Sequence, residues 1–486
     1  MCGILFRLLQ SSNLGDESFS NSSRKDLWNQ LMTKNTQRGP DIQDQYSESL
    51  DNFELDFFGA VLHLRGKSVI KQPLIDDDQN ILLWNGEIFD GLEVPFGEND
   101  TICLSTALKD SKNISNEIND NNGVVKVLQM IEGPYSIIYW QGSKRKLWFG
   151  RDCLGRRSLL WHIPSDERDS FLLTSVGCKV PHRPEHFEAV SYFQEVPADG
   201  IYCLDINTML SSGSLGSFKK FLTHFKWDLP FGRLNGTLPN LNELPSTSPE
   251  SASNPFVPAI SLEMEQAINQ MIDVLGDSVR RRVSEIPRIG RQEDASVAIL
   301  FSGGLDCICL AALADKYIPH GKPIDLLNVS FENPRIQQSK KKKTAKESDK
   351  KKPIYDVPDR LTGRQGVEEL RKISPNRIWN FVEVNVPYEE VCQYKGEILE
   401  LMSPSDTIMD LSIAMAFWFA VRGNGQIACP NGSEEFIKFE SNARVILIGV
   451  GADELLAGYS RHREAFNQGG WEKLIQEAKN RLIAPN

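Results

Sequence analysis

Two kinds of strand pattern divide this chain and constrain its fold more than any other feature. Up to residue 203 the apolar runs are short, alternate with polar residues and are bounded by Gly, Pro and Asp, as in FFGAVLHL (57–64) and PYSIIYW (134–140). From about residue 259 the runs are wholly apolar and separated by helical patterns, as in VAILF (297–301) and VILIGV (445–450). The first pattern predicts packed antiparallel strands, and the second predicts a parallel sheet covered on both faces.

The domain organisation follows from this change of pattern. At 486 residues the chain is long enough for two domains that each bury a core. We predict a first domain at 1–203, a linker or insertion rich in Gly, Ser and Pro at 208–256, and a second domain at 259–486. The lysine-rich stretch QQSKKKKTAKESDKKK lies in 337–358, a segment that we predict to be a flexible solvated loop rather than a nucleic-acid patch.

The composition favours a soluble globular protein, with 40% hydrophobic residues, 24% charged residues and a formal net charge of −11. An acidic balance argues against a general nucleic-acid binder, and no apolar run approaches the length of a membrane span. The first residues lack the basic flank and apolar core of a signal peptide. The 9 cysteines form no CxxC pair and the 7 histidines show no zinc spacing. We therefore expect a cytoplasmic protein with reduced thiols and no transition metal.

The chain begins MCGILF, which places a cysteine directly after the initiator methionine. Removal of Met1 would leave Cys2 with a thiol and a free α-amine on one residue. The ordinary pKa values of these groups are about 8.5 and about 8, so they are matched for proton exchange near neutral pH. Any residue can follow Met1, so this feature alone does not establish a nucleophile.

A set of weaker signals supports a catalytic role for Cys2. Arg65 follows HL, NGE (85–87) follows an apolar run, and Asp100 follows GEN, with RGPD and KQPL in order between them. Each alone is weak, since NGE is also a plain turn sequence. As a set they resemble the class II glutamine amidotransferase domain, an N-terminal-nucleophile hydrolase with an αββα sandwich fold.

The resemblance, over 1–203, implies a role for each matching residue. The thiolate of Cys2 attacks the side-chain amide carbon of glutamine. The side chain of Asn85 and the N–H of Gly86 stabilise the oxyanion, and one such donor is typically worth about 10²–10³ in rate. A guanidinium can pair with the α-carboxylate of glutamine and a carboxylate with its α-ammonium. The implied glutamine-binding residues are Arg65, Asn85, Glu87 and Asp100.

Two loops in the second half resemble an ATP site. SGGLDC (302–307) joins a strand to a helix, where backbone N–H groups form an anion site, and resembles the SGGxDS loop of the ATP-pyrophosphatase (adenine nucleotide α-hydrolase-like) group, with Cys307 replacing the serine. GVGADELLAGY (449–459) resembles a GxGADExxxGY segment of asparagine synthetases. Mg²⁺ is held by carboxylates together with phosphates. The implied ATP-binding residues are Phe301, Ser302, Gly303, Gly304, Val329 and Gly449, and the implied Mg²⁺ ligands are Asp306 and Asp453.

The whole chain resembles the glutamine-hydrolysing asparagine synthetases of the two-domain type. The implied reaction adenylates the side-chain carboxylate of aspartate with Mg·ATP, and ammonia freed at Cys2 passes through an internal tunnel and displaces AMP. Three stretches indicate a narrower eukaryotic subgroup of this family. They are VPDRLTGRQGVEEL (357–370), SPNRIWNFVEVNV (374–386) and DTIMDLSIAMAFWFAVRG (406–423).

Three departures keep other functions open. Val450 stands where the family has the glutamate of GEG, Asp410 stands where the family has the arginine of TTIRAS, and the sequence stops soon after AGYSRHR. One alternative is a glutaminase whose ATP-binding half regulates rather than synthesises. The others are a ligase for a different acceptor and a non-catalytic scaffold, although a scaffold would not need Cys2 and its surroundings. The sequence leaves a homodimer open.

Overall fold

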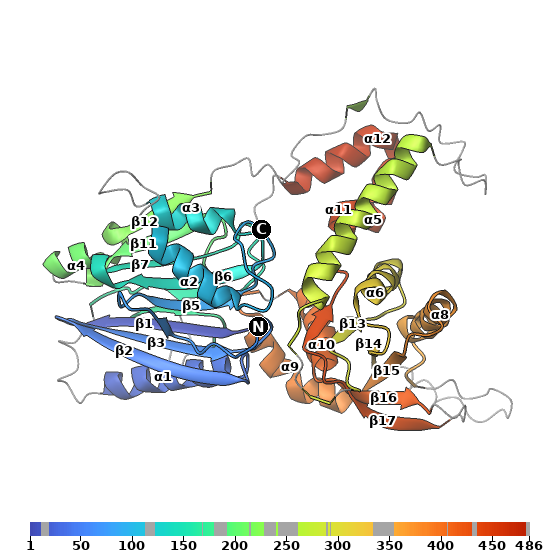
Figure 1. Ribbon diagram of the computed structural model, residues 1–486, viewed down its shortest axis with the longest axis horizontal. Helices are drawn as coiled ribbons and strands as arrows, with labels where there is room; N and C mark the ends of the chain where they lie inside the picture. The colour runs from blue at the N-terminus through green and yellow to red at the C-terminus, as the bar shows by residue number, and fades with distance from the viewer. Residues whose placement is uncertain are drawn as a thin grey trace. The chain divides into compact units, whose positions relative to one another are not determined.

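The computed structural model contains two compact units (Figure 1). The first comprises Met1–Trp227, Glu285–Ile289 and Glu389–Trp418, and the second comprises Asp228–Ser284, Gly290–Tyr388 and Phe419–Asn486. The structure describes all residues except 11–18, 112–121, 168, 179–191, 213–214, 228–239, 242–260, 288–289, 292, 334–353, 406, 430–434 and 483–486.

The first unit is built on two antiparallel sheets, each with 6 strands among the described residues. One has the order β10 (Gln194–Glu195), β8 (Leu160–His162), β9 (Phe171–Thr174), β1 (Gly3–Gln10), β3 (Phe53–Val61) and β2 (Ile42–Leu50). The other has the order β12 (Leu222–Lys226), β11 (Gly200–Asp205), β7 (Lys146–Arg151), β6 (Tyr135–Gln141), β5 (Ile81–Gly86) and β4 (Leu74–Ile75).

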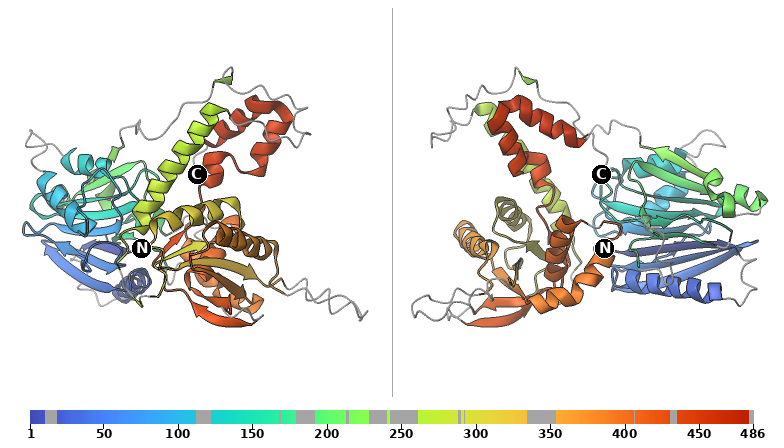
Figure 2. Two further views of the ribbon diagram at one scale, coloured as in Figure 1. Left: turned by 45° about the vertical axis from the view of Figure 1, so that its right-hand side comes forward. Right: turned by 180° about the vertical axis from the view of Figure 1, so that it is seen from behind.

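The two sheets pack face to face and helices cover their outer faces. The shared core contains Phe6 and Phe57 from the first sheet and Phe149 from the second. Helix α1 (Phe19–Thr36) buries Leu27 and Leu31 against the outer face of the first sheet, and Figure 2 shows this helix along the sheet from two sides. Helices α2 (Asp100–Asp110) and α3 (Asn122–Met130) lie over the second sheet (Figure 1). This helix–sheet–sheet–helix order is the one expected from the sequence.

The first unit continues beyond residue 203, into the segment 208–256 that composition predicted to be a linker. Strand β11 is followed by α4 (Ile206–Ser212), the 3₁₀ segment η4 (Leu215–Phe221) and β12, which pairs with β11. The side chains of Leu215 and Phe218 are buried in the shared core, so apolar burial holds this part in the sandwich. The remainder of that segment, apart from Asn240 and Leu241, lies outside the described residues, as does most of 337–358.

The second unit contains a mixed sheet with 6 strands among the described residues. Its order is β17 (Phe436–Glu440), β16 (Asn424–Ala428), β15 (Trp379–Val386), β14 (Ile324–Phe331), β13 (Val297–Leu300) and β18 (Val445–Leu447). The last four strands are parallel, as their continuous apolar runs predicted, whereas β16 and β17 add an antiparallel edge. The described helices of this unit are α5 (Leu262–Val283), α6 (Leu305–Tyr317), α8 (Pro358–Ile373), α11 (Ala452–Leu456) and α12 (Ser460–Leu482). Two further helices, α9 (Tyr388–Met402) and α10 (Ile408–Val421), fall mostly within the first unit.

Strand order reverses at β13, which has β14 on one side and β18 on the other. Because the three strands are parallel, the loops after β13 and β18 lie at the same edge of the sheet. Ligands of open α/β sheets bind at such a reversal point, outside the carboxyl ends of the strands.

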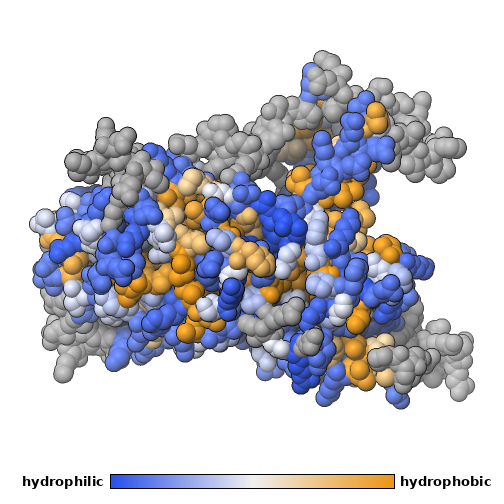
Figure 3. Space-filling view, viewed as in Figure 1, coloured by the Kyte–Doolittle hydropathy of each residue, from blue (hydrophilic) through white to orange (hydrophobic). Residues whose placement is uncertain are grey.

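Apolar side chains are exposed on helix α5, including Leu262 and Val274, and Figure 3 shows apolar patches among the polar surface over this helix. No helix in the described ranges is long and apolar enough to cross a membrane.

Candidate functional site

A pocket in the first unit brings Cys2 together with the other residues of the glutamine hypothesis. Cys2 directly precedes β1, whose antiparallel register pairs Gly3 with Ala60 of β3 and so brings Cys2 to Val61, next to Leu62. A Cβ on Gly3 would lie 2.2 Å from the carbonyl oxygen of Asn35, so only glycine allows this close approach. The predicted residues that line the pocket are Cys2, Arg65, Asn85, Gly86, Glu87 and Asp100.

The thiol of Cys2 is held by backbone groups. The N–H of Leu62 donates to Sγ at 3.5 Å, and the Nε of Arg38 donates to the Cys2 carbonyl at 3.3 Å. Burial raises the pKa of the Cys2 thiol. Met1 is present in the structure and burial lowers the pKa of its α-amine to about 5. With Met1 attached, the environment therefore favours the neutral thiol beside a neutral amine.

Asn85 offers a donor that nothing else in the described structure uses. Its side chain is 1% exposed, and its Nδ2 has no hydrogen-bond partner among the described residues. A buried amide left unpaired costs about 1–3 kcal/mol, so a fold that keeps one at a pocket wall has a place for an acceptor there. Its neighbour Gly86 ends β5, where a Cβ would lie 2.6 Å from the Cβ of Tyr135. The unpartnered donor of Asn85 and the backbone of Gly86 thus both lie at the wall of the pocket.

The charged groups expected to recognise glutamine lie at the start of α2 and in the loop after β3. Asp100 is buried, and one of its carboxylate oxygens accepts from the N–H of Ile88 at 3.2 Å. Burial, with repulsion from Glu87 second, raises the pKa of Asp100 to about 6. Asn99 caps α2 through the N–H of Thr101 and donates to the Arg65 carbonyl at 2.9 Å. This single side chain therefore ties Arg65 to the first turn that carries Asp100.

Two arginines near Cys2 were not predicted as site residues: Arg157, which lines the pocket, and Arg38, which contacts the Cys2 backbone. Arg157 donates to the carboxylate of Glu87 at 3.2 Å and lines the pocket, so Glu87 is engaged in an ion pair. Arg38 belongs to RGPD, a segment whose position along the chain supports the resemblance but which predicts no role for the arginine. The local sequence around a basic residue gives no signal of which distant group its side chain contacts. The sequence therefore offered no basis for choosing these two from its other arginines.

The loop after β13 has the backbone shape of an anion site. Gly303 has φ +84°, and a Cβ there would lie 2.2 Å from the backbone of Thr362, so this position requires glycine. Helix α6 begins at Leu305, and its N-cap residue Gly304 provides no side-chain cap. The Sγ of Cys307 donates to the Gly304 carbonyl at 3.1 Å, so the cysteine supports the loop from behind. Backbone N–H groups at such a helix start attract phosphate.

The second loop reaches the first. A Cβ on Gly449 would lie 2.9 Å from the Cβ of Asp306, which brings the loop after β18 against the first turn of α6. Asp453 lies in the first turn of α11, and both carboxylates are exposed. No group of three or more His, Cys, Asp and Glu forms a metal cluster within the described ranges. Mg²⁺ is commonly held by one or two carboxylates together with substrate phosphates, so Asp306 and Asp453 fit this ion.

The remaining predicted residues have mixed positions. Phe301 is buried, and its N–H donates to the Leu327 carbonyl at 2.8 Å, while Ser302 is exposed and Val329 is half-buried on β14. Of the two residues that depart from the asparagine synthetase pattern, Val450 is 70% exposed. Asp410 accepts from the Thr407 hydroxyl at 2.6 Å and its N–H donates to that hydroxyl at 3.1 Å. This reciprocal pair caps α10, which supplies a structural reason for a carboxylate at this position.

Comparison with known proteins gives one matching domain family and several relatives over nearly the full chain. A glutamine amidotransferase domain matches residues 62–177. Asparagine synthetase domain-containing protein 1 of Homo sapiens is 36% identical over 98% of this chain and 81% of its own length. A Drosophila melanogaster asparagine synthetase domain-containing protein is 30% identical over 96% and 79%. Glutamine phosphoribosylpyrophosphate amidotransferase from B. subtilis has 13% identity over 69% of this chain and 68% of its own, with a TM-score of 0.28, too low to carry an argument.

Proposed function

The chain belongs to the family of asparagine synthetase domain-containing protein 1, as the narrower resemblance predicted, and we propose that it is a glutamine-dependent amidotransferase with two coupled reactions. The first hydrolyses glutamine to glutamate and ammonia at Cys2. The second uses ATP to activate the side-chain carboxylate of aspartate, so that ammonia displaces AMP and gives asparagine.

The observation that carries the proposal is the pairing of Cys2 with the unpartnered amide of Asn85 in one pocket. After removal of Met1, the α-amine of Cys2 takes the thiol proton and the thiolate attacks the amide carbon of glutamine. The amide oxygen becomes an oxyanion that accepts from Asn85 Nδ2 and the N–H of Gly86. Ammonia leaves with a proton from the α-amine, and water hydrolyses the resulting thioester to glutamate.

Recognition of glutamine as an amino acid falls to two charged residues of the pocket, the half-buried Arg65 and the buried Asp100. The guanidinium of Arg65 pairs with the α-carboxylate, and the carboxylate of Asp100 accepts from the α-ammonium. The Arg157–Glu87 ion pair closes the wall beside them. An amide without both charged ends leaves Asp100 buried and unpaired, which favours glutamine over simple amides.

In the second unit the backbone N–H groups of residues 302–304 receive the phosphates of ATP, and Asp306 and Asp453 hold Mg²⁺. The metal, when bound, offsets the charge that develops on the phosphates. Support comes from the close approach of Gly449 to Asp306 and from the position of both loops at the strand-order reversal. Val329 lies on the neighbouring strand, where it would contact the adenine.

The deciding experiment measures pyrophosphate release from Mg·ATP with glutamine, with and without aspartate, in protein whose Met1 removal is confirmed by mass. A Cys2→Ala variant supplied with ammonium salt is the control. Aspartate-dependent release that persists in the variant with ammonia supports both reactions. Glutamine hydrolysis without any aspartate-dependent release contradicts the synthetic step and leaves the glutaminase in place.

A second candidate is a glutaminase whose ATP-binding unit does not synthesise asparagine. Its support is the exposed valine at position 450, which has no group to take a proton from ammonia. If this valine is what limits synthesis, Val450→Glu raises ammonia-dependent asparagine formation above the wild-type rate. An active wild type with an unchanged variant contradicts this candidate.

A further inference from the structure

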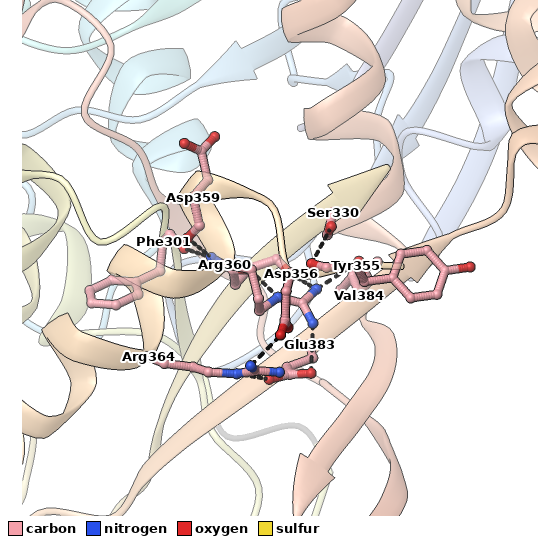
Figure 4. A network of polar contacts seen from close by, with 10 residues as sticks. Phe301, Ser330, Tyr355, Asp356, Asp359, Arg360, Arg364, Glu383 and Val384 are labelled. Atoms are coloured by element: carbon pink, nitrogen blue, oxygen red, sulfur yellow. Dashed lines mark hydrogen bonds and ion pairs between the residues drawn. The ribbon is translucent and has the colours of Figure 1, made fainter. Parts of the chain in front are cut away.

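The stretch VPDRLTGRQGVEEL, which the proposed reactions leave unexplained, contains a fully buried arginine. Arg360 lies in the first turn of α8 and is 0% exposed. Its Nη1 donates to Glu383 on β15 at 2.6 Å, and its Nε donates to the Asn328 side-chain oxygen at 2.6 Å. Nη2 reaches the carbonyls of Asn328 and Val384, each at 3.3 Å. Every nitrogen of this guanidinium therefore has a partner (Figure 4).

Through Asn328 this arginine acts on the loop after β13. The Nδ2 of Asn328 donates to the carbonyl of Phe301 at 2.7 Å and to the carbonyl of Asp359 at 2.9 Å. Because Arg360 occupies the oxygen of the amide, the NH₂ group must face these two carbonyls. The buried arginine thus sets the orientation of the amide that holds the residue before Ser302.

A second contact from the same helix holds the next carbonyl. The hydroxyl of Thr362 donates to the carbonyl of Ser302 at 2.7 Å. Gly303, in the left-handed conformation, packs directly on the backbone of Thr362. The carbonyls of Phe301 and Ser302 therefore point toward Asn328 and α8. A ligand would bind on the opposite side of the loop, where backbone N–H groups can face it.

The cost of burying this charge indicates that the contact has a use. Taking a guanidinium out of water costs several kcal/mol, and apolar residues of similar volume are often at least as stabilising. A second buried arginine of the same unit, Arg377, shows the structural alternative. Its Nη2 donates to the carbonyls of Asp315 and Ile318 and its Nη1 to those of Pro319 and Lys322, so its hydrogen bonds close the carboxyl end of α6 and do not involve loop 301–304.

We infer that Asn328, Arg360 and Thr362 are positioning residues that hold loop 301–304 in its anion-binding shape and thereby set the affinity for a nucleoside triphosphate. This inference rests on the proposed nucleotide site. None of the three touches the phosphates in this account. They act through the Phe301 and Ser302 carbonyls, and Glu383 supplies the countercharge that keeps Arg360 in place.

Asn328→Asp tests the network with little change of volume. The new carboxylate still accepts from Arg360 but cannot donate to the Phe301 carbonyl. Thr362→Val removes the second contact at a solvent-exposed position. Arg364→Gln is the matched control, because Arg364 pairs with the same Glu383 at 2.8 Å and makes no contact with the loop. Melting temperature identifies variants that fail to fold.

Two readouts are measured on each full-length protein. Calorimetric titration with Mg·ATP should show a Kd raised about tenfold in Asn328→Asp, which loses a buried hydrogen bond, and about threefold in Thr362→Val, which loses an exposed one. Titration with AMP, which lacks the pyrophosphate, should change less. Hydrogen exchange without nucleotide should be faster in amides 302–307 of both variants, and Arg364→Gln should match wild type in both readouts.

The outcomes distinguish failure of the proposed nucleotide site from failure of the positioning role. If wild type binds no Mg·ATP, the proposed nucleotide site is wrong, and the exchange data alone decide whether α8 holds the loop. If wild type binds but both variants bind equally well with unchanged exchange, the inference is overturned. If Asn328→Asp does not fold, the exposed Thr362→Val decides, because a purely structural role lowers melting temperature without changing Kd or loop exchange.

Discussion

The pocket at Cys2 and the loops after β13 and β18 present their candidate functional groups in different ways. In the pocket, Asn85 and Asp100 are buried, and the pKa values of Cys2 and Asp100 are displaced by burial. In the loops, Asp306 and Asp453 are exposed. The pocket depends on the exclusion of water by the surrounding sheets. The loops depend on a backbone conformation that neighbouring residues hold in place.

The difference follows from the two kinds of sheet. In the sandwich the functional groups lie on strand β5 or against strand ends inside a core, so packing determines their protonation and hydrogen bonding. In the parallel sheet the candidate functional groups lie beyond the strand ends, where Ser302, Asp306 and Asp453 are exposed. Substitutions should therefore act through desolvated side chains in the first unit and through backbone position or ligand charge in the second.

The largest effect is expected for Cys2→Ala, which separates the two regions completely. Glutamine hydrolysis should fall on the order of 10⁴-fold or more because no other group in the pocket can form the thioester. Ammonia-dependent pyrophosphate release should persist. Glutamate production and pyrophosphate release measure the two activities, and Cys392→Ala, at an exposed position on α9, is the control. Residual hydrolysis near the wild-type rate would assign the nucleophile elsewhere.

Asn85→Asp should reduce glutamine hydrolysis about 10²–10³-fold, because a carboxylate replaces the oxyanion donor with an acceptor. The loss should lie mainly in kcat, since the donor acts on the charge that develops during attack. Ser136→Ala is the matched control, because Ser136 is the cross-strand partner of Asn85 and does not line the pocket. Equal losses in both variants would indicate damage to the sheet rather than to catalysis.

Asp306→Asn should lower ATP-dependent pyrophosphate release about 10²-fold, corresponding to several kcal/mol of lost charge stabilisation. Glutamine hydrolysis and the melting temperature should remain close to wild type, since the side chain is exposed. Raising the Mg²⁺ concentration should recover part of the activity. A fall in melting temperature of many degrees would instead make this carboxylate a structural group.

Glutamine affinity should fall as pH decreases through about 6, the raised pKa of Asp100. A carboxyl with a raised pKa is protonated at higher pH than usual, and the neutral form cannot pair with the α-ammonium. The Kd should therefore rise about tenfold per pH unit well below this value. Titration calorimetry on Cys2→Ala isolates binding from thiol ionisation, and Asp100→Asn should bind weakly with a flat pH profile.

The smallest effect is expected for Cys307→Ser. The Cys307 thiol donates to the Gly304 carbonyl, and a hydroxyl can make the same bond with a shorter side chain. ATP-dependent release should stay within about threefold of wild type, as for a change below 1 kcal/mol. A rise of more than tenfold in ATP-dependent pyrophosphate release would show that this side chain contacts phosphate. The loops would then depend on side chains as the pocket does, which contradicts the comparison above.

Local sequence predicted much of this protein because several groups of the chemistry occur in short segments. Cys2, NGE and SGGLDC are each weak signals alone, and their order along the chain is what predicted the two candidate sites. Strand type was predicted correctly for β6 and β13. Both strands are buried along nearly their whole length, so burial of one face or of two does not account for their different sequence patterns. The linker prediction from residue 208 failed for η4 because two apolar side chains, Leu215 and Phe218, outweigh a Ser- and Gly-rich composition.

The sequence by itself determined which chemical groups are present, and in what order, because these are properties of adjacent residues. The tertiary structure decided which of those groups are out of water and which distant residues join them. Arg157 meets Glu87 across 70 positions, and Asn328 meets Phe301 across 27. No local periodicity encodes such contacts, because they arise when sheets and helices pack. The same packing leaves the Nδ2 of Asn85 without a hydrogen-bond partner in the part of the chain that the structure describes, and it raises the pKa of Asp100.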